Sequence, residues 1–365
     1  QMMRLFNEAK RVEGPVIVHV LTEKGRGYEP ARKHPDQFHG TGPFDIATGK
    51  QLSSKKVPTY TDVFARTMVH LGKENRKLVG ITAAMKEGTG LVEFEKQFPD
   101  RLFDVGIAEE HAVSFAAGLA LGGMVPVVAI YSSFLQRAVD QMLHDVCMQK
   151  LHVIFAIDRA GLVGADGETH QGCFDISYLT MMPNMTVMAP KNQWELSRML
   201  EFAVNFDGPC AIRYPRGSAC QSLKEFDAPV NYGKSEVLYR GRKTAILSLG
   251  SMTSVCEEVY KEMKNRGSDP TFVNVRFAKP LDTELLDELA ADHELFVTVE
   301  ENVKNGGFGE HVSSYMEACH PEVRVLTIAV WNRFVEHGEV DSLRAKIGLS
   351  APDILSAIEE YEEQK

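Results

Sequence analysis

Along most of the chain, short apolar runs alternate with stretches in which apolar residues recur at helical spacing. Between residues 59 and 217 the apolar runs predict strands at 78–82, 102–105, 125–130, 153–157, 186–188 and 211–214. The stretches around them predict helices at 60–71, 92–98, 109–121, 135–148 and 194–204. This alternation is typical of a parallel sheet that helices cover on both faces.

A second series of the same kind follows residues 218–233, a polar segment with Pro229 that we interpret as a linker. The apolar runs in this series predict strands at 245–249, 272–275, 295–299 and 323–328, with helices between and after them. The predicted fold class is therefore α/β, with two consecutive parallel-sheet α/β domains at residues 58–217 and 234–365.

The first 57 residues have a different pattern. Met3, Phe6 and Ala9 predict a helix, and residues 15–22 are an apolar run that predicts a buried strand. A glycine-broken loop and a polar stretch follow, and the chain begins at Gln1. One helix and one strand cannot enclose a core, so we expect this segment to pack on the rest of the chain or on something absent from it.

Composition and charge narrow the class of protein. Hydrophobic residues make up 44% and charged residues 25% of the sequence, as in ordinary globular proteins. The net charge of -10 argues against nucleic acid as the main partner, so an anionic substrate would need a local group of arginines. No apolar run reaches the ~18 residues of a membrane span, and no secretory signal is recognisable. Six cysteines without CxxC spacing predict reduced thiols in a cytoplasmic protein.

Polar residues that could carry chemistry follow several predicted strands. Glu109 and Glu110 open a helix, where a carboxylate can cap the free N–H groups or face a ligand. Tyr131 and Phe134 lie where a strand runs into a helix, and they could equally belong to the core. Arg137, one turn further on, could be solvated.

The longest polar loop follows the strand at 153–157. It keeps several glycines together with Asp158, Arg159, Asp166, Glu168 and His170. Loops of this composition are disproportionately functional, and histidine is the side chain best suited to proton transfer near neutral pH. After the last strand of the first domain, Arg213 and Arg216 could hold a phosphate or form structural ion pairs.

Metal-binding motifs are weak in this sequence. No third ligand with matching spacing joins Asp166 and His170. Ala165-Asp166-Gly167 followed by Asn192 resembles the GDG…N signature for magnesium and a diphosphate, but its first glycine is alanine. Asn192 is instead expected to cap a helix. We therefore expect no metal ligand among these residues.

Taken together, several segments resemble the 1-deoxy-D-xylulose-5-phosphate synthases. They are Lys24-Gly-Arg-Gly-Tyr-Glu-Pro30, Phe38-His39, Asp104-Val-Gly-Ile-Ala-Glu-Glu-His111, Tyr131-Ser-Ser-Phe-Leu-Gln-Arg137, the whole loop from Asp158 to Gly172, and Tyr214-Pro-Arg-Gly217. The similarity runs from about residue 10 to the C-terminus, and the loop with His170 is its most specific part.

The resemblance implies an activity, its cofactors and its partners. The activity is condensation of pyruvate with glyceraldehyde 3-phosphate, with loss of CO2, for isoprenoid, thiamine and pyridoxal precursors. Thiamine diphosphate and Mg2+ are the implied cofactors, and a homodimer is the implied assembly. Residues 1–57 would end the diphosphate-binding domain, whose magnesium ligands would precede them. Residues 58–217 would bind the pyrimidine, and residues 234–365 would support dimer packing.

The resemblance also implies roles for single residues. Glu109 matches the glutamate on a pyrimidine ring nitrogen, and this interpretation replaces helix capping. His170 matches a position for proton transfer at the acceptor carbonyl, and His39 matches a histidine near the thiazolium. The other matched positions contact the cofactor (Phe134 at the pyrimidine, Lys24 at the diphosphate) or the substrate (Tyr131, Arg159, Asp166, Arg216 and, more loosely, Arg137). Glu110, His111 and Arg213 are expected to be structural.

Other interpretations stay open. A beta-type subunit of a two-chain thiamine-dependent 2-oxo-acid dehydrogenase also consists of a pyrimidine domain and a C-terminal domain, but the segment with Lys24 and His39 argues against it. A transketolase fits the loop from Arg159 to His170 less well. From a different class, the chain could be a non-catalytic dimerising fragment. Because the magnesium site lies outside it, we expect the chain alone to be inactive.

Overall fold

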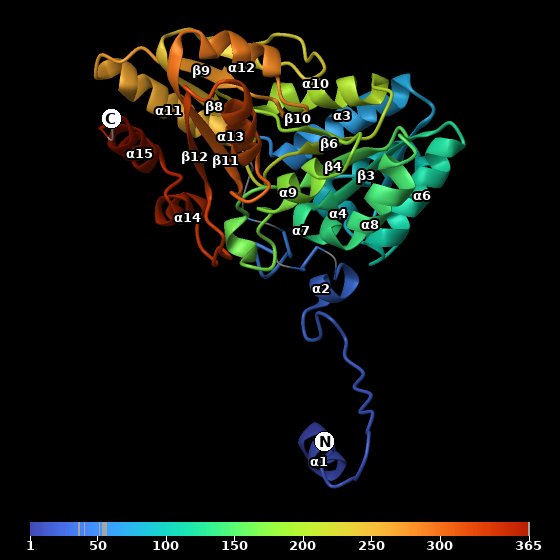
Figure 1. The fold of residues 1–365 in the computed structure, drawn as a ribbon. Coiled ribbons are helices and arrows are strands. Elements are labelled where there is room, and N and C mark those ends of the chain that lie inside the picture. Colours follow the sequence, from blue (N-terminus) through green and yellow to red (C-terminus); the bar gives the residue numbers. More distant parts are fainter. Residues whose placement is uncertain (36, 40, 51, 53–56, 364–365) are drawn as a thin grey trace. The chain divides into compact units, whose positions relative to one another are not determined.

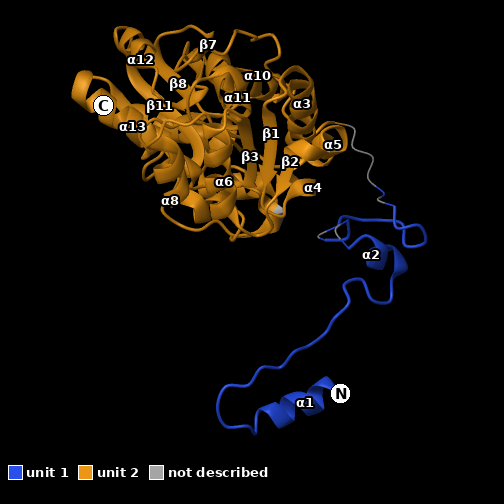
Figure 2. Ribbon diagram, turned by 90° about the vertical axis from the view of Figure 1, so that its right-hand side faces the viewer, with its two compact units in different colours: residues 1–56 blue, residues 57–365 orange. Residues whose placement is uncertain are grey.

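The structure is a computed structural model that describes residues 1–35, 37–39, 41–50, 52 and 57–363 (Figure 1). The chain divides into two compact units, residues 1–56 and 57–365 (Figure 2).

The smaller unit contains the helices α1 (Met2–Ala9) and α2 (Glu29–Lys33), of which α1 confirms the prediction. The strand predicted at 15–22 is wrong, because this segment is unpaired and its side chains are exposed. A strand needs a neighbour for its backbone N–H and C=O groups, and the described part of this unit offers none. Tyr28, Phe38 and Phe44 pack together, with ring centroids 5.1 to 5.7 Å apart.

The larger unit contains two sheets that lie next to each other (Figure 1). Among the described residues, the first sheet has seven strands in the order β10-β5-β6-β4-β3-β1-β2. Its strands are β1 (Leu78–Thr82), β2 (Leu102–Asp104), β3 (Val125–Tyr131), β4 (Ile154–Asp158), β5 (Thr186–Met188), β6 (Cys210–Arg213) and β10 (Phe277–Lys279). All neighbours are parallel except β10, which runs antiparallel to β5.

The predicted strands of this sheet are confirmed to within one or two residues, whereas β10 was not predicted. Alternate residues of the central strands face opposite sides of the sheet: Val128 and Ile130 belong to one buried cluster, and Val127 and Ala129 belong to another. Both faces are therefore covered, as expected for parallel strands that are apolar throughout.

The helices of this half begin with α3 (Tyr60–Glu74), α4 (Lys86–Thr89), α5 (Val92–Gln97) and α6 (Glu109–Leu121), and end with α9 (Asp175–Thr180) and α10 (Gln193–Asn205). The helix predicted near 135–148 is confirmed as a helical segment, but it is not one regular α-helix. It consists of α7 (Ser132–Leu135), a 3-10 turn (Gln136–Ala138), α8 (Val139–Gln141) and a π-helical turn (Met142–Cys147). Leu135, Met142 and Val146 are buried nevertheless, because apolar spacing fixes a face and not the type of turn.

The second sheet has five strands among the described residues, in the order β12-β11-β8-β9-β7. They are β7 (Glu236–Tyr239), β8 (Lys243–Ser248), β9 (Thr271–Asn274), β11 (His293–Val303) and β12 (Arg324–Val330). The helices are α11 (Met252–Asn265), α12 (Thr283–Ala290), α13 (Phe308–Cys319), α14 (Val340–Ile347) and α15 (Ala351–Glu363). Only β7, which was not predicted, is antiparallel to its neighbour.

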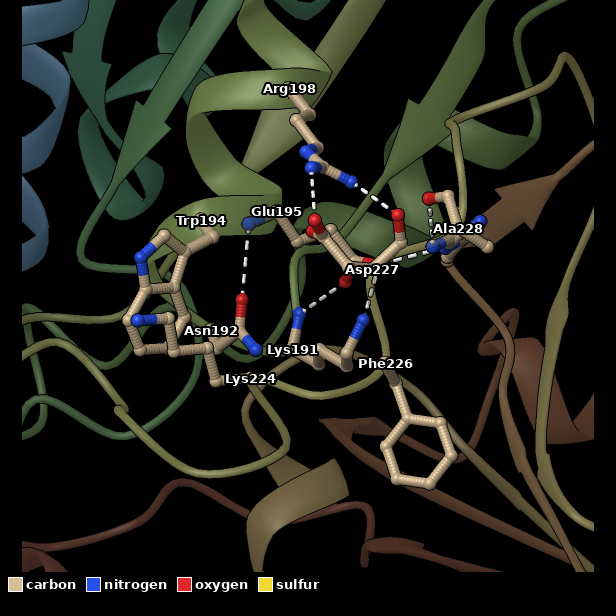
Figure 3. A pocket seen from close by; sticks show the side chains of 10 residues that line it. Lys191, Asn192, Trp194, Glu195, Arg198, Lys224, Phe226, Asp227 and Ala228 are labelled. Carbon is tan, nitrogen blue, oxygen red and sulfur yellow. Dashed lines mark hydrogen bonds and ion pairs between the residues drawn. The ribbon is translucent and has the colours of Figure 1, made fainter.

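The two halves of the larger unit share a core and a buried ion-pair network. One apolar cluster contains side chains of both sheets. Lys191, at the start of α10, binds Glu195 at 3.1 Å and Glu236 of the second sheet at 2.6 Å, and Arg276 binds Glu195 at 2.7 Å. A small pocket beside this network has room for about one water molecule (≈ 10 Å³; Figure 3). The pocket contains none of the predicted site residues.

In the part of the chain that the structure describes, no helix is long and apolar enough to cross a membrane. No group of three metal-ligating side chains occurs among the same residues.

Asn192 accepts the N–H of Glu195 at 3.0 Å, so it caps α10 as predicted.

Candidate active site

The predicted site residues of the larger unit lie where strands of the first sheet end. Tyr131 is the last residue of β3, and Arg159 directly follows β4. Glu109 opens α6, which follows β2, and Arg216 comes three residues after β6. These strands are parallel, so their carboxyl ends meet at one edge of the sheet, where open α/β sheets place their ligand sites.

Aromatic and cationic side chains form a continuous row at this edge. The guanidinium carbon of Arg159 lies 3.7 Å from the centre of the Tyr131 ring, which stacks on Phe134 at 5.6 Å. The ring of Phe134 meets His170 edge-on at 5.2 Å, and Arg137 lies 5.3 Å from the centre of the same ring. Five residues that were singled out from the sequence are therefore connected by successive contacts.

Glu109 is buried at the first position of α6, with 2% of its surface exposed. Its Oε1 accepts a hydrogen bond from Nη1 of Arg137 at 2.6 Å. Among the described residues, its second oxygen has no hydrogen-bond partner. Ala108 occupies the N-cap position, so the carboxylate does not cap α6, although its charge is favourable at a helix N-terminus.

Backbone hydrogen bonds hold the two ends of the long loop together, and side-chain contacts hold the residues between them. Gly161 and Gly172 exchange backbone hydrogen bonds of 2.7 and 2.8 Å. Inside the loop, Asp166 pairs with Arg216 at 3.4 Å. His170 shares a hydrogen bond of 2.9 Å with the hydroxyl of Thr169. Asp166 and Arg216, which were both predicted to contact the substrate, are thus brought together.

Arg159 is held by Asp158 of its own motif and by Gly88, which carried no signal in the sequence. Its Nη1 donates to the carbonyl of Gly88 at 3.0 Å and pairs with Asp158 at 3.2 Å. Asp158 is fully buried and accepts from Thr61 at 2.9 Å. Burial raises the pKa of Asp158, against the opposing effect of Arg159. A side chain at Gly88 would collide with the Tyr131 hydroxyl, so only glycine leaves room for that ring.

The surroundings keep Tyr131 neutral. Burial raises its pKa, and the charges of Asp158 and Asp166 act in the same direction. Arg159 and Arg216 lower the pKa of Tyr131 but do not outweigh burial. At neutral pH the phenol is therefore available as a hydrogen-bond donor.

Lys24 and His39 belong to the smaller unit. Nζ of Lys24 lies 2.7 Å from Nδ1 of His39, so the structure brings these two predicted residues together with each other. Three further residues were expected to be structural. Arg213 forms a buried ion pair with Asp175 at 2.9 Å, His111 stacks on Phe115 at 5.9 Å, and Glu110 is exposed.

Two known protein domains match this chain. The family model described as "Transketolase, pyrimidine binding domain" matches residues 56–221, and the one described as "Transketolase, C-terminal domain" matches residues 233–354. The chain belongs to the transketolase family. Within this family, it is 52% identical over 359 residues to a 1-deoxy-D-xylulose-5-phosphate synthase of Lachnoclostridium phytofermentans, covering 98% of this chain and 57% of that protein.

A second relative in the transketolase family, 1-deoxy-D-xylulose-5-phosphate synthase 1 of Geobacter sulfurreducens, is 48% identical over 371 residues, covering 99% of this chain. These relatives confirm the resemblance that the motifs gave. The chain spans 57% of the length of both proteins.

Solved transketolase structures confirm the fold. A structure titled "Split gene transketolase, inactive beta4 tetramer" has a TM-score of 0.74 and 30% identity, covering 83% of this chain and 97% of its own. The transketolase of Campylobacter jejuni has a TM-score of 0.70 at 19% identity, covering 84% of this chain and 47% of its own. The predicted domain boundaries and the roles of single residues stay predictions.

Proposed function

We propose that this chain is part of a synthase that condenses pyruvate with D-glyceraldehyde 3-phosphate, with loss of CO2, to 1-deoxy-D-xylulose 5-phosphate. The observation that carries the proposal is that Arg216 pairs with Asp166 of the loop that also contains Arg159 and His170. In a chain of net charge -10, two arginines and a histidine in or against one loop suit an aldehyde that carries a phosphate. The names of the relatives support the same activity.

The residues at the sheet edge fit the pyrimidine end of thiamine diphosphate. Glu109 is buried and has one oxygen without a partner among the described residues, so it can bind a ring nitrogen that carries a proton. Phe134, which contacts the Arg137 that binds Glu109, would pack on the pyrimidine. When bound, thiamine diphosphate supplies the nucleophilic carbon and the electron sink that decarboxylation of a 2-oxo acid requires. Lys24 would approach its diphosphate, and the Mg2+ ligands would lie in the part of the protein that this chain does not span.

The chain's own residues would bind and orient the acceptor. Arg159 and Arg216 hold its phosphate, and Asp166 orients Arg216. Carbon–carbon bond formation turns the aldehyde oxygen into a hydroxyl, which needs one proton, and His170 supplies it. Tyr131 donates a hydrogen bond as a neutral phenol. His39 would lie near the part derived from pyruvate, and Arg137 would hold Glu109 in place.

The enzyme would act as a homodimer in the cytoplasm, and this chain would be inactive alone. A subunit role in a two-chain enzyme is the second candidate. The similar structure, of which 97% is covered, is described as a split-gene transketolase and as an inactive tetramer.

The choice of donor substrate separates a synthase from a transketolase. The chain is assayed alone, and with the remaining portion of a curated relative, using pyruvate and glyceraldehyde 3-phosphate. We expect equimolar CO2 and 1-deoxy-D-xylulose 5-phosphate only from the mixture. Activity with a ketose phosphate as donor and without CO2 would indicate a transketolase. Tight, magnesium-dependent binding of thiamine diphosphate by the chain alone would refute the expected inactivity.

A further inference from the structure

The loop that carries Asp166 and His170 is bound by one buried amide side chain. Gln171 follows His170 directly and is 3% exposed. Its Oε1 accepts the N–H of Val163 at 2.8 Å. Its Nε2 donates to the backbone carbonyl of Glu336 at 3.0 Å. Glu336 lies in the C-terminal domain, between β12 and α14, so this side chain connects the loop to the other domain.

Val163, whose N–H binds Gln171, is also bound through its carbonyl by Arg216, the arginine that we propose for the phosphate. The carbonyl of Val163 accepts from Nη1 of Arg216 at 3.4 Å, while its N–H donates to Gln171. The same nitrogen of Arg216 pairs with Asp166 at 3.4 Å. A displacement of Gln171 would therefore move the backbone on which Arg216 and Asp166 are arranged.

A backbone contact next to this bridge brings the two segments close together. The N–H of Gly338 approaches the carbonyl of Gly164 at 3.5 Å. A Cβ on Gly164 would lie 2.7 Å from the carbonyl oxygen of Gly338, and φ at Gly164 is +65°. The chain needs glycine here because the loop lies directly against the segment around residue 338.

We propose that Gln171 is a positioning residue through which the C-terminal domain fixes the geometry of the loop on the acceptor-phosphate side of the site. The identity of the acceptor rests on the proposed function, whereas the bridge itself does not. The C-terminal domain would thus have a role in substrate binding in addition to the dimer packing that the resemblance implies.

Amide hydrogen exchange in the full 365-residue chain tests the bridge without any need for activity. Gln171→Glu keeps an acceptor for Val163 but cannot donate to Glu336, and Gln171→Leu removes both bonds. Loss of one buried hydrogen bond corresponds to about tenfold faster exchange in the loop. We expect this in peptides covering residues 159–172 and 335–340 for both variants, with additional exchange of the Val163 amide in Gln171→Leu. The control is Gln149→Leu, because Gln149 donates to the carbonyl of Asp145 on an exposed surface and lies outside the loop.

Kinetics separate positioning from general stability. In an assembled enzyme that makes 1-deoxy-D-xylulose 5-phosphate, Gln171→Glu should raise KM for glyceraldehyde 3-phosphate about tenfold and leave KM for pyruvate unchanged. Unchanged exchange in the loop, faster exchange throughout residues 57–363, or an equal rise in both KM values would each overturn the proposal. If no assembly makes the product, the proposed function fails, and the exchange experiment still decides the bridge.

Discussion

At the scale of single residues, Glu109 combines burial with an incompletely satisfied carboxylate. Glu109→Gln keeps the size of the side chain but removes the charge that would hold a protonated ring nitrogen. We expect turnover of the assembled enzyme to fall about 10²- to 10⁴-fold, as for loss of a group that acts in proton transfer. Steady-state production of 1-deoxy-D-xylulose 5-phosphate measures the effect.

The neighbouring glutamate provides the control for this substitution. Glu110 lies in the same helical turn but is exposed, so Glu110→Gln makes the same chemical change outside the site. We expect its turnover to stay within about twofold of the wild type. Equal losses in the two variants would show that the start of α6 matters for stability only.

Arg216 tests the other end of the site. Its guanidinium is partly exposed and pairs with Asp166, so it can turn towards a phosphate. Arg216→Ala removes a charge-assisted contact worth about 1.5–3 kcal/mol, which predicts a KM for glyceraldehyde 3-phosphate about 10- to 150-fold higher. The KM for pyruvate should not change. Arg198→Ala, which breaks an Arg–Asp pair with Asp227 outside the site, is the control, and an unchanged KM in Arg216→Ala would remove Arg216 from the phosphate site.

At the scale of structural elements, the backbone pairing of Gly161 with Gly172, which joins the two ends of the loop, depends on Gly161. Its φ of +74° disfavours other residues, and a Cβ there would collide with the carboxylate of Glu301. Gly123 has a similar φ of +80° but open space around it. Gly161→Ala should therefore destabilise the protein by about 1–2 kcal/mol more than Gly123→Ala, because only the first adds overpacking to backbone strain. Thermal unfolding of both variants measures the difference, and equal shifts would mean that Glu301 moves aside freely.

The sequence predicted elements well where local patterns decide them. Strands such as β1 and β5 were predicted with their observed bounds, because each is an apolar run between turn signals. Strand β10 could not be predicted, because it exists only through pairing with β5, about ninety residues earlier in the chain. The apolar run at 15–22 failed for the opposite reason, since a strand pattern without a partner makes no strand.

In the candidate site, too, local motifs identified some residues and missed others. Tyr131, Phe134, Arg137, Arg159 and His170 could be chosen from their motifs, and the structure brings them into one row. The residues that hold this row lie elsewhere in the chain. Thr61 and Gly88 act on Asp158, Arg159 and Tyr131 from positions more than forty residues away, and no local pattern marks such contacts.

At the scale of the whole larger unit, Glu300 is a buried acid in the second sheet. It is fully buried on β11 and accepts the backbone N–H groups of Phe308 and Gly309, at 2.9 and 2.8 Å, at the start of α13. Burial raises the pKa of Glu300 from 4.5 to about 7, although the two N–H groups oppose the shift. Its protonation is thereby coupled to folding of residues 57–363.

The direction of this coupling follows from the two pKa values. Between pH 4.5 and 7 the carboxyl group is ionised in the unfolded chain but still protonated in the folded one, so unfolding releases a proton. The free energy of unfolding should therefore fall by up to about 3 kcal/mol as pH rises through this window, and level off above it. Glu300→Gln cannot titrate, so it should lack this contribution.

Urea unfolding of the wild type and of Glu300→Gln, measured from pH 4.5 to 8, isolates the effect of this one carboxyl group. All other titrating groups are common to both proteins and cancel in the difference between their free energies of unfolding. We expect the wild type to lose stability relative to the variant up to about pH 7, and a constant difference above that. A difference that rises with pH would mean that the N–H groups of α13 outweigh burial and that Glu300 is ionised in the folded protein.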